Sequence, residues 1–582
     1  MFSRLIVERN VAVPMRDGVL LRADVYRPET NQPVPAIVAR LPYNKDALNM
    51  MIHAIQPVRA AEAGFAVVYQ DTRGRYASEG EFYPFRHETQ DGYDTVEWVA
   101  AQPWCSGAVG MTGASYFGAT QWLTAIAQPP HLKAIFPVVT TSEYYESWTY
   151  QGGAFQLGFT LLWTLQALAA DTSMRQAAAG EADPEEWVRL ITGADALDDL
   201  YQYLPLSRLP LLKESKAADY YFDWIAHAND DEYWQSIAVN RHYDKVRVPA
   251  WNVGGWYDLF LHGTIENFVR MRKEGGSEVA RQGQRLLIGP WAHGNLTNFY
   301  PEHNFGIMSD SAIVDFTALQ LEFFGHYLRG DHNGIEKSPP VRIFVMGENR
   351  WRDENEWPLA RIRYERWYLH GDGQGGSSGG ALSPESPADE PADTYLYDPR
   401  NPTPTVGGPT FLPGLHVAAN SGPRDQREGE ARPDVLVYTS APLERPVEVT
   451  GPLTAILYAS TSAYDTDWVV RLCDVYPDGA SRILAEGILR ASYRDGYGQR
   501  KPVAPNQVVE YRINLVATSN LFQPGHRIRV DICSASFPRF DRNAGTGNPP
   551  GVDKLADLWP ALQTVHHDAE RPSHIVLPII PR

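Results

Sequence analysis

The chain has 582 residues, of which 43% are hydrophobic, and a formal net charge of −18. A chain of this length exceeds a single hydrophobic core, so we expect two or three domains. The acidic balance argues against nucleic acid or an anionic membrane surface as a partner.

Cysteine usage and the N-terminal segment bear on metal binding and location. The 3 cysteines, Cys105, Cys473 and Cys533, form no CxxC pair and no cluster with metal-ligand spacing, so we expect no metal. A sparse, odd cysteine count fits a reducing cytoplasm. Residues 1–18 lack the basic and apolar regions of a signal peptide, and no apolar segment is long enough to cross a bilayer. We therefore expect a cytoplasmic protein without a membrane partner.

Residues 1–144 alternate strand-like and helix-like segments. Alternation of this kind predicts a mainly parallel sheet with helices on both faces, as the first part of an α/β core. The expected strands cover residues 36–40, 66–70 and 109–112, and the expected helices cover residues 52–63, 91–101 and 116–126.

The pattern changes over residues 145–240, where strand signals fade and Leu, Ala, Trp and acidic residues dominate. We interpret this part as a helical cap inserted into the core. Strand signals return at residues 250–253, 285–288 and 341–346, so residues 241–350 are expected to complete the core.

The last part of the chain, residues 351–582, has no long helical pattern. After a Gly-rich surface segment at residues 371–380, short runs of Val, Ile, Tyr and Thr are separated by Pro, Gly and Asp. This composition predicts an all-β sandwich, for which a jelly roll is the expected topology.

The stretch VGMTGASYFGATQW, residues 109–122, carries the strongest functional signal. A short apolar strand runs into a Gly-rich turn and then a helix, the context in which a serine becomes an exposed nucleophile. The motif is G-x-S-x-x-G, and Gly113 and Gly118 leave room for the turn and the helix against the sheet. Ser115 is the candidate nucleophile, and the Tyr116 amide is a candidate oxyanion donor. A Gly-rich turn with an incidental serine is the alternative.

A serine nucleophile needs a base, and the base needs an orienting acid. Asp258 follows the expected strand at residues 250–253, and His293 follows the next strand at residues 285–288. Both lie at carboxyl ends of strands, where an open α/β sheet builds its site, and the order is Ser, Asp, His. Taken singly, such an Asp is more often a turn or helix cap, and a loop His is more often non-catalytic. Together, the three residues favour a catalytic triad.

Motifs along the whole chain point to a known family. They are VPMRDGVLLRADVYRP, QDTRGRYASEGEF, GMTGASYFGATQW, GGWYDLF, GPWAHGNLT, FVMGENRWRDENEWP, ATSNLFQPGHRI and HIVLPII. On these motifs the sequence resembles the bacterial cocaine esterase-like serine hydrolases. They belong to the X-Pro dipeptidyl-peptidase family, which also includes cephalosporin acylases and α-amino acid ester hydrolases. The resemblance implies an α/β-hydrolase core, a helical cap and a C-terminal jelly roll.

The resemblance also implies roles for individual residues. It makes Ser115 the nucleophile, Asp258 the orienting acid and His293 the base. It adds the hydroxyl of Tyr43 as a second oxyanion donor beside the Tyr116 amide, and a preorganised phenol can replace a backbone donor in that role. On pattern alone, Tyr43 is more often a packed loop residue.

The acyl pocket implied by the resemblance is aromatic. Trp148 and Trp163 of the cap, with Phe260 from the core, match aromatic positions that enclose the acyl group. Phe155 and Phe159 are further candidates for its walls. On pattern alone, aromatic residues on a cap helix are more often core residues.

We expect a metal-independent, cofactor-free serine esterase that hydrolyses carboxylic esters, aromatic acyl esters among them, through an acyl-enzyme. Two other hypotheses stay open. One is an acylase or X-Pro dipeptidyl-peptidase that cleaves amides with the same triad, and the other is a non-enzymatic binding scaffold. The expected partner is a small-molecule ester, while the natural substrate and the choice between a monomer and a homodimer are left open by the sequence.

Overall fold

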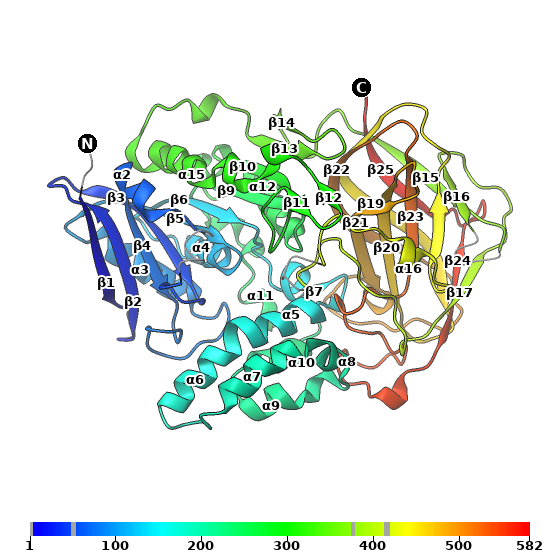
Figure 1. The fold of residues 1–582 in the computed structure, drawn as a ribbon, viewed down its shortest axis with the longest axis horizontal. Coiled ribbons are helices and arrows are strands. Elements are labelled where there is room, and N and C mark those ends of the chain that lie inside the picture. The colour runs from blue at the N-terminus through cyan, green and yellow to red at the C-terminus, as the bar shows by residue number, and fades with distance from the viewer. Residues whose placement is uncertain (1–3, 48–53, 374–378, 413–419) are drawn as a thin grey trace.

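The fold has three parts. The computed structural model describes residues 4–47, 54–373, 379–412 and 420–582. An α/β core occupies the left and centre of Figure 1, a layer of cap helices lies below it, and an all-β domain lies on the right. The first two residues of the helix expected at 52–63 and part of the Gly-rich segment at 371–380 fall outside the described residues.

The core is built on a 10-stranded sheet. Its strands are β1 (Leu5–Pro14), β2 (Leu20–Pro28), β3 (Val34–Leu41), β4 (Ala66–Asp71), β5 (Cys105–Ala114), β6 (Leu132–Val138), β9 (Trp251–Tyr257), β10 (Arg285–Ala292), β13 (Val341–Val345) and β14 (Arg350–Glu354). Their spatial order is β1-β2-β4-β3-β5-β6-β9-β10-β13-β14. The pairings from β4 to β13 are parallel, and the outer pairings are antiparallel. The central strands are largely buried, as expected for parallel strands covered on both faces.

The structure confirms the mainly parallel sheet and corrects its extent. Strands are present at each of the six segments where the sequence predicts one. Four strands were missed, namely β1, β2, β6 and β14. β1 is the half-exposed strand of an antiparallel edge hairpin with β2, and β14 is a highly charged edge strand, so neither β1 nor β14 shows a buried-strand pattern. Because β14 ends at Glu354, the core sheet extends past residue 350.

Helices pack on the core sheet. The core helices are α2 (Pro57–Glu62), α3 (Glu88–Ala100), α4 (Tyr116–Ile126), α12 (Leu261–Glu274), α13 (Glu278–Gln282), α14 (Ser311–Val314) and α15 (Phe316–Phe324). α4 has the bounds expected from the sequence. α12 ends with Arg272 and Lys273 in its last turn, where positive charge is favourable to the helix dipole. None of the described helices has the length and apolar character that crossing a membrane would require.

The cap lies between β6 and β9 and is mostly helical. Two of its segments, η1 (Tyr145–Thr149) and η2 (Thr164–Ala169), are π-helical, a conformation that is frequent at functional sites. A short hairpin of β7 (Tyr150–Gln151) and β8 (Ala154–Phe155) was not expected from the sequence. The other cap helices are α5 (Leu157–Trp163), α6 (Ala170–Ala178), α7 (Glu186–Asp195), α8 (Leu197–Gln202), α9 (Pro210–Ser215), α10 (Asp219–Ala226) and α11 (Glu232–Gln235).

The C-terminal part is an all-β domain, as expected, and its finer assignment as a jelly roll stays a prediction. Its strands form an 11-stranded sheet in which nearly all pairings are antiparallel. They are β15 (Arg363–His370), β16 (Gly380–Ser383), β17 (Asp393–Tyr397), β18 (Leu436–Thr439), β19 (Val447–Thr461), β20 (Asp467–Val475), β21 (Ser481–Arg490), β22 (Val509–Phe522), β23 (Arg527–Cys533), β24 (Ala561–His566) and β25 (His574–Ile580).

Two glycines allow α4 to approach the sheet closely. Gly113, at the end of β5, has a φ of +138°, and a Cβ there would lie 2.4 Å from Cβ of Phe117. A Cβ on Gly118 would lie 2.4 Å from Cγ2 of Thr140, which follows β6. The structure therefore confirms that both glycines sit where the turn and the helix pack against the sheet.

We expect Gly118→Ala to lower the free energy of unfolding by about 1–3 kcal/mol, because the added methyl overpacks the contact between α4 and Thr140. Denaturation in urea would measure the change. Gly498→Ala is the control, since a Cβ at this exposed position meets no atom within 4 Å, and its effect should stay within about 0.5 kcal/mol. Equal stability of the two variants would show that the contact relaxes without cost.

Candidate active site

Ser115 lies at a tight turn between β5 and α4. Its φ of 58° and ψ of −123° fall in a region that L-residues rarely adopt, and such strain persists only where the surroundings hold it. The Ser115 N–H donates to the carbonyl of Val138 at 2.9 Å. The Thr140 hydroxyl donates to the Ser115 carbonyl at 2.8 Å. These contacts hold the turn that presents the Ser115 side chain at the carboxyl edge of the sheet.

His293 and Asp258 meet Ser115 at this edge. Nε2 of His293 lies 3.0 Å from Oγ of Ser115, and Nδ1 of His293 lies 2.9 Å from Oδ1 of Asp258. Asp258 directly follows β9, and His293 directly follows β10, which pairs with β9 in parallel. The structure thus brings the three residues predicted from the sequence into one hydrogen-bonded chain. In such a chain the imidazole can accept the serine proton while the carboxylate holds the Nδ1–H.

Two members of this hydrogen-bonded chain are shielded from water. The Asp258 side chain is fully buried, and that of His293 is 7% exposed. Oδ2 of Asp258 has no hydrogen-bond partner within the described part of the chain. Because charge interactions are stronger in a low-dielectric surrounding, the carboxylate stabilises a protonated His293 more than it would in water.

Two hydrogen-bond donors lie beside Ser115. Tyr116 is the first residue of α4, so its N–H belongs to the helix N-terminal amides that lack an intrahelical acceptor. The Tyr43 hydroxyl, in the loop after β3, interacts with the Ser115 side chain. It also accepts a hydrogen bond from Nε1 of Trp163 at 2.8 Å. Because Tyr43 is the acceptor in this hydrogen bond, its hydroxyl hydrogen is not used there and is free to be donated to another group.

The Tyr43 hydroxyl keeps its proton. Burial raises the pKa of Tyr43 above its ordinary value, and the Trp163 hydrogen bond and the Arg75 charge oppose this rise only in part. A phenol that stays neutral at neutral pH can donate to a developing oxyanion. The interaction with Trp163 was not predicted from the sequence, because no local pattern links the two residues, which lie 120 positions apart.

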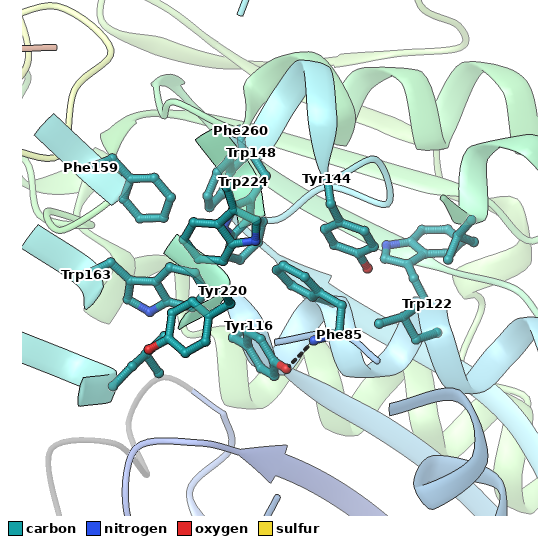
Figure 2. Close-up of a cluster of buried hydrophobic side chains, with 14 of the residues drawn as sticks. Phe85, Tyr116, Trp122, Tyr144, Trp148, Phe159, Trp163, Tyr220, Trp224 and Phe260 are labelled. Atoms are coloured by element: carbon teal, nitrogen blue, oxygen red, sulfur yellow. Dashed lines mark hydrogen bonds between the residues drawn. The ribbon is translucent and has the colours of Figure 1, made fainter. Parts of the chain in front are cut away.

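The Tyr116 side chain is anchored away from Ser115. Its hydroxyl donates to Oε1 of Glu88 at 3.0 Å and accepts the Phe85 N–H at 2.9 Å, the dashed contact in Figure 2. Glu88 in turn pairs with Arg40 at 2.8 Å. Burial raises the pKa of both Glu88 and Tyr116. This network holds the first residue of α4, and with it the direction of the Tyr116 N–H.

Aromatic side chains gather next to the triad. Figure 2 shows Trp148, Trp163 and Phe260 in one cluster with rings from the core. The Phe260 ring lies edge-to-face on His293 at 4.8 Å, and Trp148 stacks on Phe260 at 4.3 Å. Trp163 lies 5.4 Å from Trp148. The structure therefore brings the three predicted rings together, with Phe260 next to the triad, Trp163 next to Tyr43, and Trp148 behind Phe260.

Two further rings approach His293, and one of them was missed. Phe159, an alternative wall residue in the sequence analysis, lies 6.4 Å from the His293 ring. Phe411 of the β domain lies 5.2 Å from it, edge-to-face. Phe411 sits in a Gly- and Pro-rich loop with no periodicity or polar motif, so the sequence carries no signal for it. Phe155, the other alternative, packs on Tyr150 instead.

One group of the described residues has the geometry to hold a metal ion, and it lies in the β domain. Ligand atoms of Glu430, Cys473 and Asp531 lie within 4.8 Å of one another, a cluster that the sequence analysis did not expect. Glu430 pairs with Arg529 and accepts a hydrogen bond from Ser481, and the Cys473 thiol donates to Asp531 at 3.7 Å. Burial raises the pKa of Cys473, and a protonated thiol is a poor ligand. We interpret the group as an internal hydrogen-bonded cluster.

Comparisons with known proteins extend the likeness over the whole chain. The model of the X-Pro dipeptidyl-peptidase (S15 family) matches residues 17–295, and that of the X-Pro dipeptidyl-peptidase C-terminal non-catalytic domain matches residues 333–576. The chain is 40% identical over 581 residues to the cocaine esterase of Rhodococcus sp. (strain MB1 Bresler), covering 99% of each protein.

Two solved structures share the complete architecture. An α-amino acid ester hydrolase is 26% identical, with a TM-score of 0.82, and the match covers 99% of this chain and 97% of that chain. An aminopeptidase from the marine sediment archaeon Thaumarchaeota archaeon is 27% identical, with a TM-score of 0.81, over 100% of this chain and 97% of that chain. The core, the cap and the β domain therefore occur together in related proteins.

Proposed function

The chain belongs to the X-Pro dipeptidyl-peptidase (S15) family and is a serine hydrolase of carboxylic esters, and we propose that Ser115, His293 and Asp258 carry out the hydrolysis through an acyl-enzyme. The observation that carries this proposal is the pair of contacts from His293, 3.0 Å to Ser115 Oγ and 2.9 Å to Asp258 Oδ1. The strained turn at Ser115 supports it, because such turns are typical of serine nucleophiles.

The proposed reaction has two halves that use the same groups. His293 Nε2 takes the Ser115 proton as Oγ attacks the ester carbonyl carbon, and the same nitrogen then protonates the departing alcohol. In the second half His293 takes a proton from water, the hydroxide oxygen attacks the acyl carbon, and Ser115 regains its proton as the acid leaves. Asp258 holds the Nδ1–H and stabilises the imidazolium in both halves.

The oxyanion of each tetrahedral intermediate is proposed to bind the Tyr43 hydroxyl and the Tyr116 N–H. Both donors are held by contacts with other side chains, Tyr43 by Trp163 and the Tyr116 ring by Glu88. Donors held in place in advance do not have to reorganise when the charge develops, and this is the source of their effect.

The rings beside the triad support an aromatic, uncharged acyl group as the substrate class. Phe260, Phe159 and Phe411 all face the His293 ring. An apolar pocket ranks acyl groups by the surface they bury, and about 55 Å² of additional buried surface corresponds to about tenfold in kcat/KM. The three phenyl rings carry no charge, and the Asp258 carboxylate is already engaged with His293. A substrate ammonium therefore finds little support at this wall.

We expect Ser115→Ala to lower kcat on a phenyl ester by about 10⁶-fold, because no other group would form the acyl-enzyme. Ester hydrolysis and labelling by a fluorophosphonate would measure the loss. Ser173→Ala is the control, since Ser173 is fully buried and its hydroxyl has no partner among the residues described. If Ser115→Ala retained more than a few percent of the control's turnover, Ser115 would be removed from the mechanism.

We expect Tyr43→Phe to lower kcat by about 10²–10³-fold, the effect of losing one oxyanion donor. KM should change little, because the donor acts in the transition state rather than on the bound ester. Tyr220→Phe is a matched control from the same aromatic cluster, and its buried hydroxyl lacks a partner in the described chain. If both variants kept full kcat, Tyr43 would be a packing residue only.

Two substitutions at Trp163 separate its ring from its N–H. We expect Trp163→Phe to lower kcat about 3–10-fold on acetate and benzoate esters alike, because it removes one hydrogen bond to Tyr43 and keeps an apolar ring. Trp163→Ala should add a loss of the preference for benzoate over acetate. Steady-state kinetics on both esters would test these effects. A matched anilide, measured alongside, would show whether the enzyme also cleaves amides. An unchanged ester preference in Trp163→Ala would show that other rings form the acyl pocket.

A further inference from the structure

Arg75 is a buried cation that joins the core to the cap. Its side chain is fully buried in the loop after β4. Its guanidinium donates three hydrogen bonds of 2.8 Å to backbone carbonyls: Nε to Pro42, Nη1 to Leu168 and Nη2 to Ala167. Pro42 precedes Tyr43 in the chain, whereas Ala167 and Leu168 belong to η2, the π-helical segment that begins directly after Trp163.

The surroundings of Arg75 fix the direction of its planar group. Asp171 of α6 lies 3.4 Å from Nη1 and balances the charge. The hydroxyl of Thr172 accepts from Nη1 at 3.2 Å, and the Phe82 ring lies 4.9 Å from the guanidinium carbon. A planar guanidinium with donors in a rigid fork can satisfy carbonyls from two segments at once, which the single ammonium of a lysine cannot reproduce.

Arg75 therefore holds the backbone next to both Tyr43 and Trp163. They hydrogen-bond to each other at 2.8 Å, and the backbone next to each of them is tied to one guanidinium. A shift of the cap against the core would move the Trp163 N–H relative to the Tyr43 hydroxyl, unless Arg75 held the two segments in register.

We propose that Arg75 is a positioning residue for ester hydrolysis, which holds the Tyr43 hydroxyl and its Trp163 partner in register so that the oxyanion donor is aligned only when the cap is docked. This inference rests on the proposed role of Tyr43 as an oxyanion donor. Arg75 itself does not touch the reacting atoms; it acts through backbone on both sides of the contact.

Arg73, in the same loop, is the control residue for the role proposed for Arg75. It is also largely buried, and it pairs with Asp91 at 2.6 Å and with Asp17 at 2.8 Å. Both partners belong to the core, and none of the hydrogen bonds that Arg73 makes with described residues reaches Pro42 or the cap. Loss of Arg73 should therefore affect the stability of the core without altering the alignment of Tyr43.

The test is a double-mutant cycle between Arg75 and Tyr43 in the full-length protein, with kcat and KM measured on a phenyl ester. We expect Arg75→Lys to lower kcat about 10–100-fold with a KM change under about threefold, because displacement of a catalytic group by about 1 Å costs this much. In a Tyr43→Phe background the same substitution should cost less than about threefold, since the group that it aligns is gone. Arg73→Lys should change kcat less than about twofold in both backgrounds.

The other possible outcomes show which of the two proposals is wrong. An equal loss from Arg75→Lys in both backgrounds, or no loss at all, would overturn the positioning role while leaving the proposed function intact. A Tyr43→Phe enzyme with full kcat would instead overturn the role of Tyr43 in the proposed function. Thermal melting establishes that each variant is folded. If Arg75→Lys does not fold, the same double-mutant cycle can be run with Asp171→Asn, because this change weakens the ion pair that holds the guanidinium. A loss of kcat that did not depend on Tyr43 would again count against the proposal.

Discussion

The whole site depends on parallel strands that end at one edge of the core sheet. β3, β5, β9 and β10 lie within five neighbouring positions of the sheet, and Tyr43, Ser115, Asp258 and His293 follow them in the chain. In an antiparallel arrangement, successive strand ends would alternate between opposite edges. The parallel arrangement instead brings loops that are far apart in sequence to the same edge of the sheet, and the strained turn places the Ser115 side chain at that edge.

The proposed acyl pocket and the proposed oxyanion donor share one residue, Trp163. Trp163 contributes a ring to the wall beside Trp148 and an N–H to the Tyr43 hydroxyl. A hydrogen bond between two buried polar groups is stronger than in water, and leaving either group unpaired is costly. A change at Trp163 is therefore expected to alter both the proposed pocket and the hydrogen bond to Tyr43. Selectivity for the acyl group and the rate of its hydrolysis would then change together.

The β domain takes part in the site although it supplies no triad residue. Its Phe411 ring packs on His293, and its Asp541 accepts the Phe155 N–H at 2.9 Å from the cap hairpin. Asp541 and Asp467 pair with Arg490, and all three are buried. Buried ion pairs contribute little net stability because of their desolvation, but breaking one is strongly destabilising. This arrangement holds the cap between the other two parts, where its rings face the triad.

The sequence alone predicted an α/β core followed by an all-β domain, and it singled out Ser115, Asp258 and His293 as a candidate triad, because strand ends and a Gly-rich turn are local patterns. Ser115, Asp258 and His293 each follow a short apolar run, and that signal does not depend on distant neighbours. Tertiary structure alone decided which rings face His293 and how the donors are held. Phe411 comes from an irregular loop, and Trp163 meets Tyr43 across 120 positions. Contacts of this kind arise from packing between elements whose relative placement no local pattern encodes.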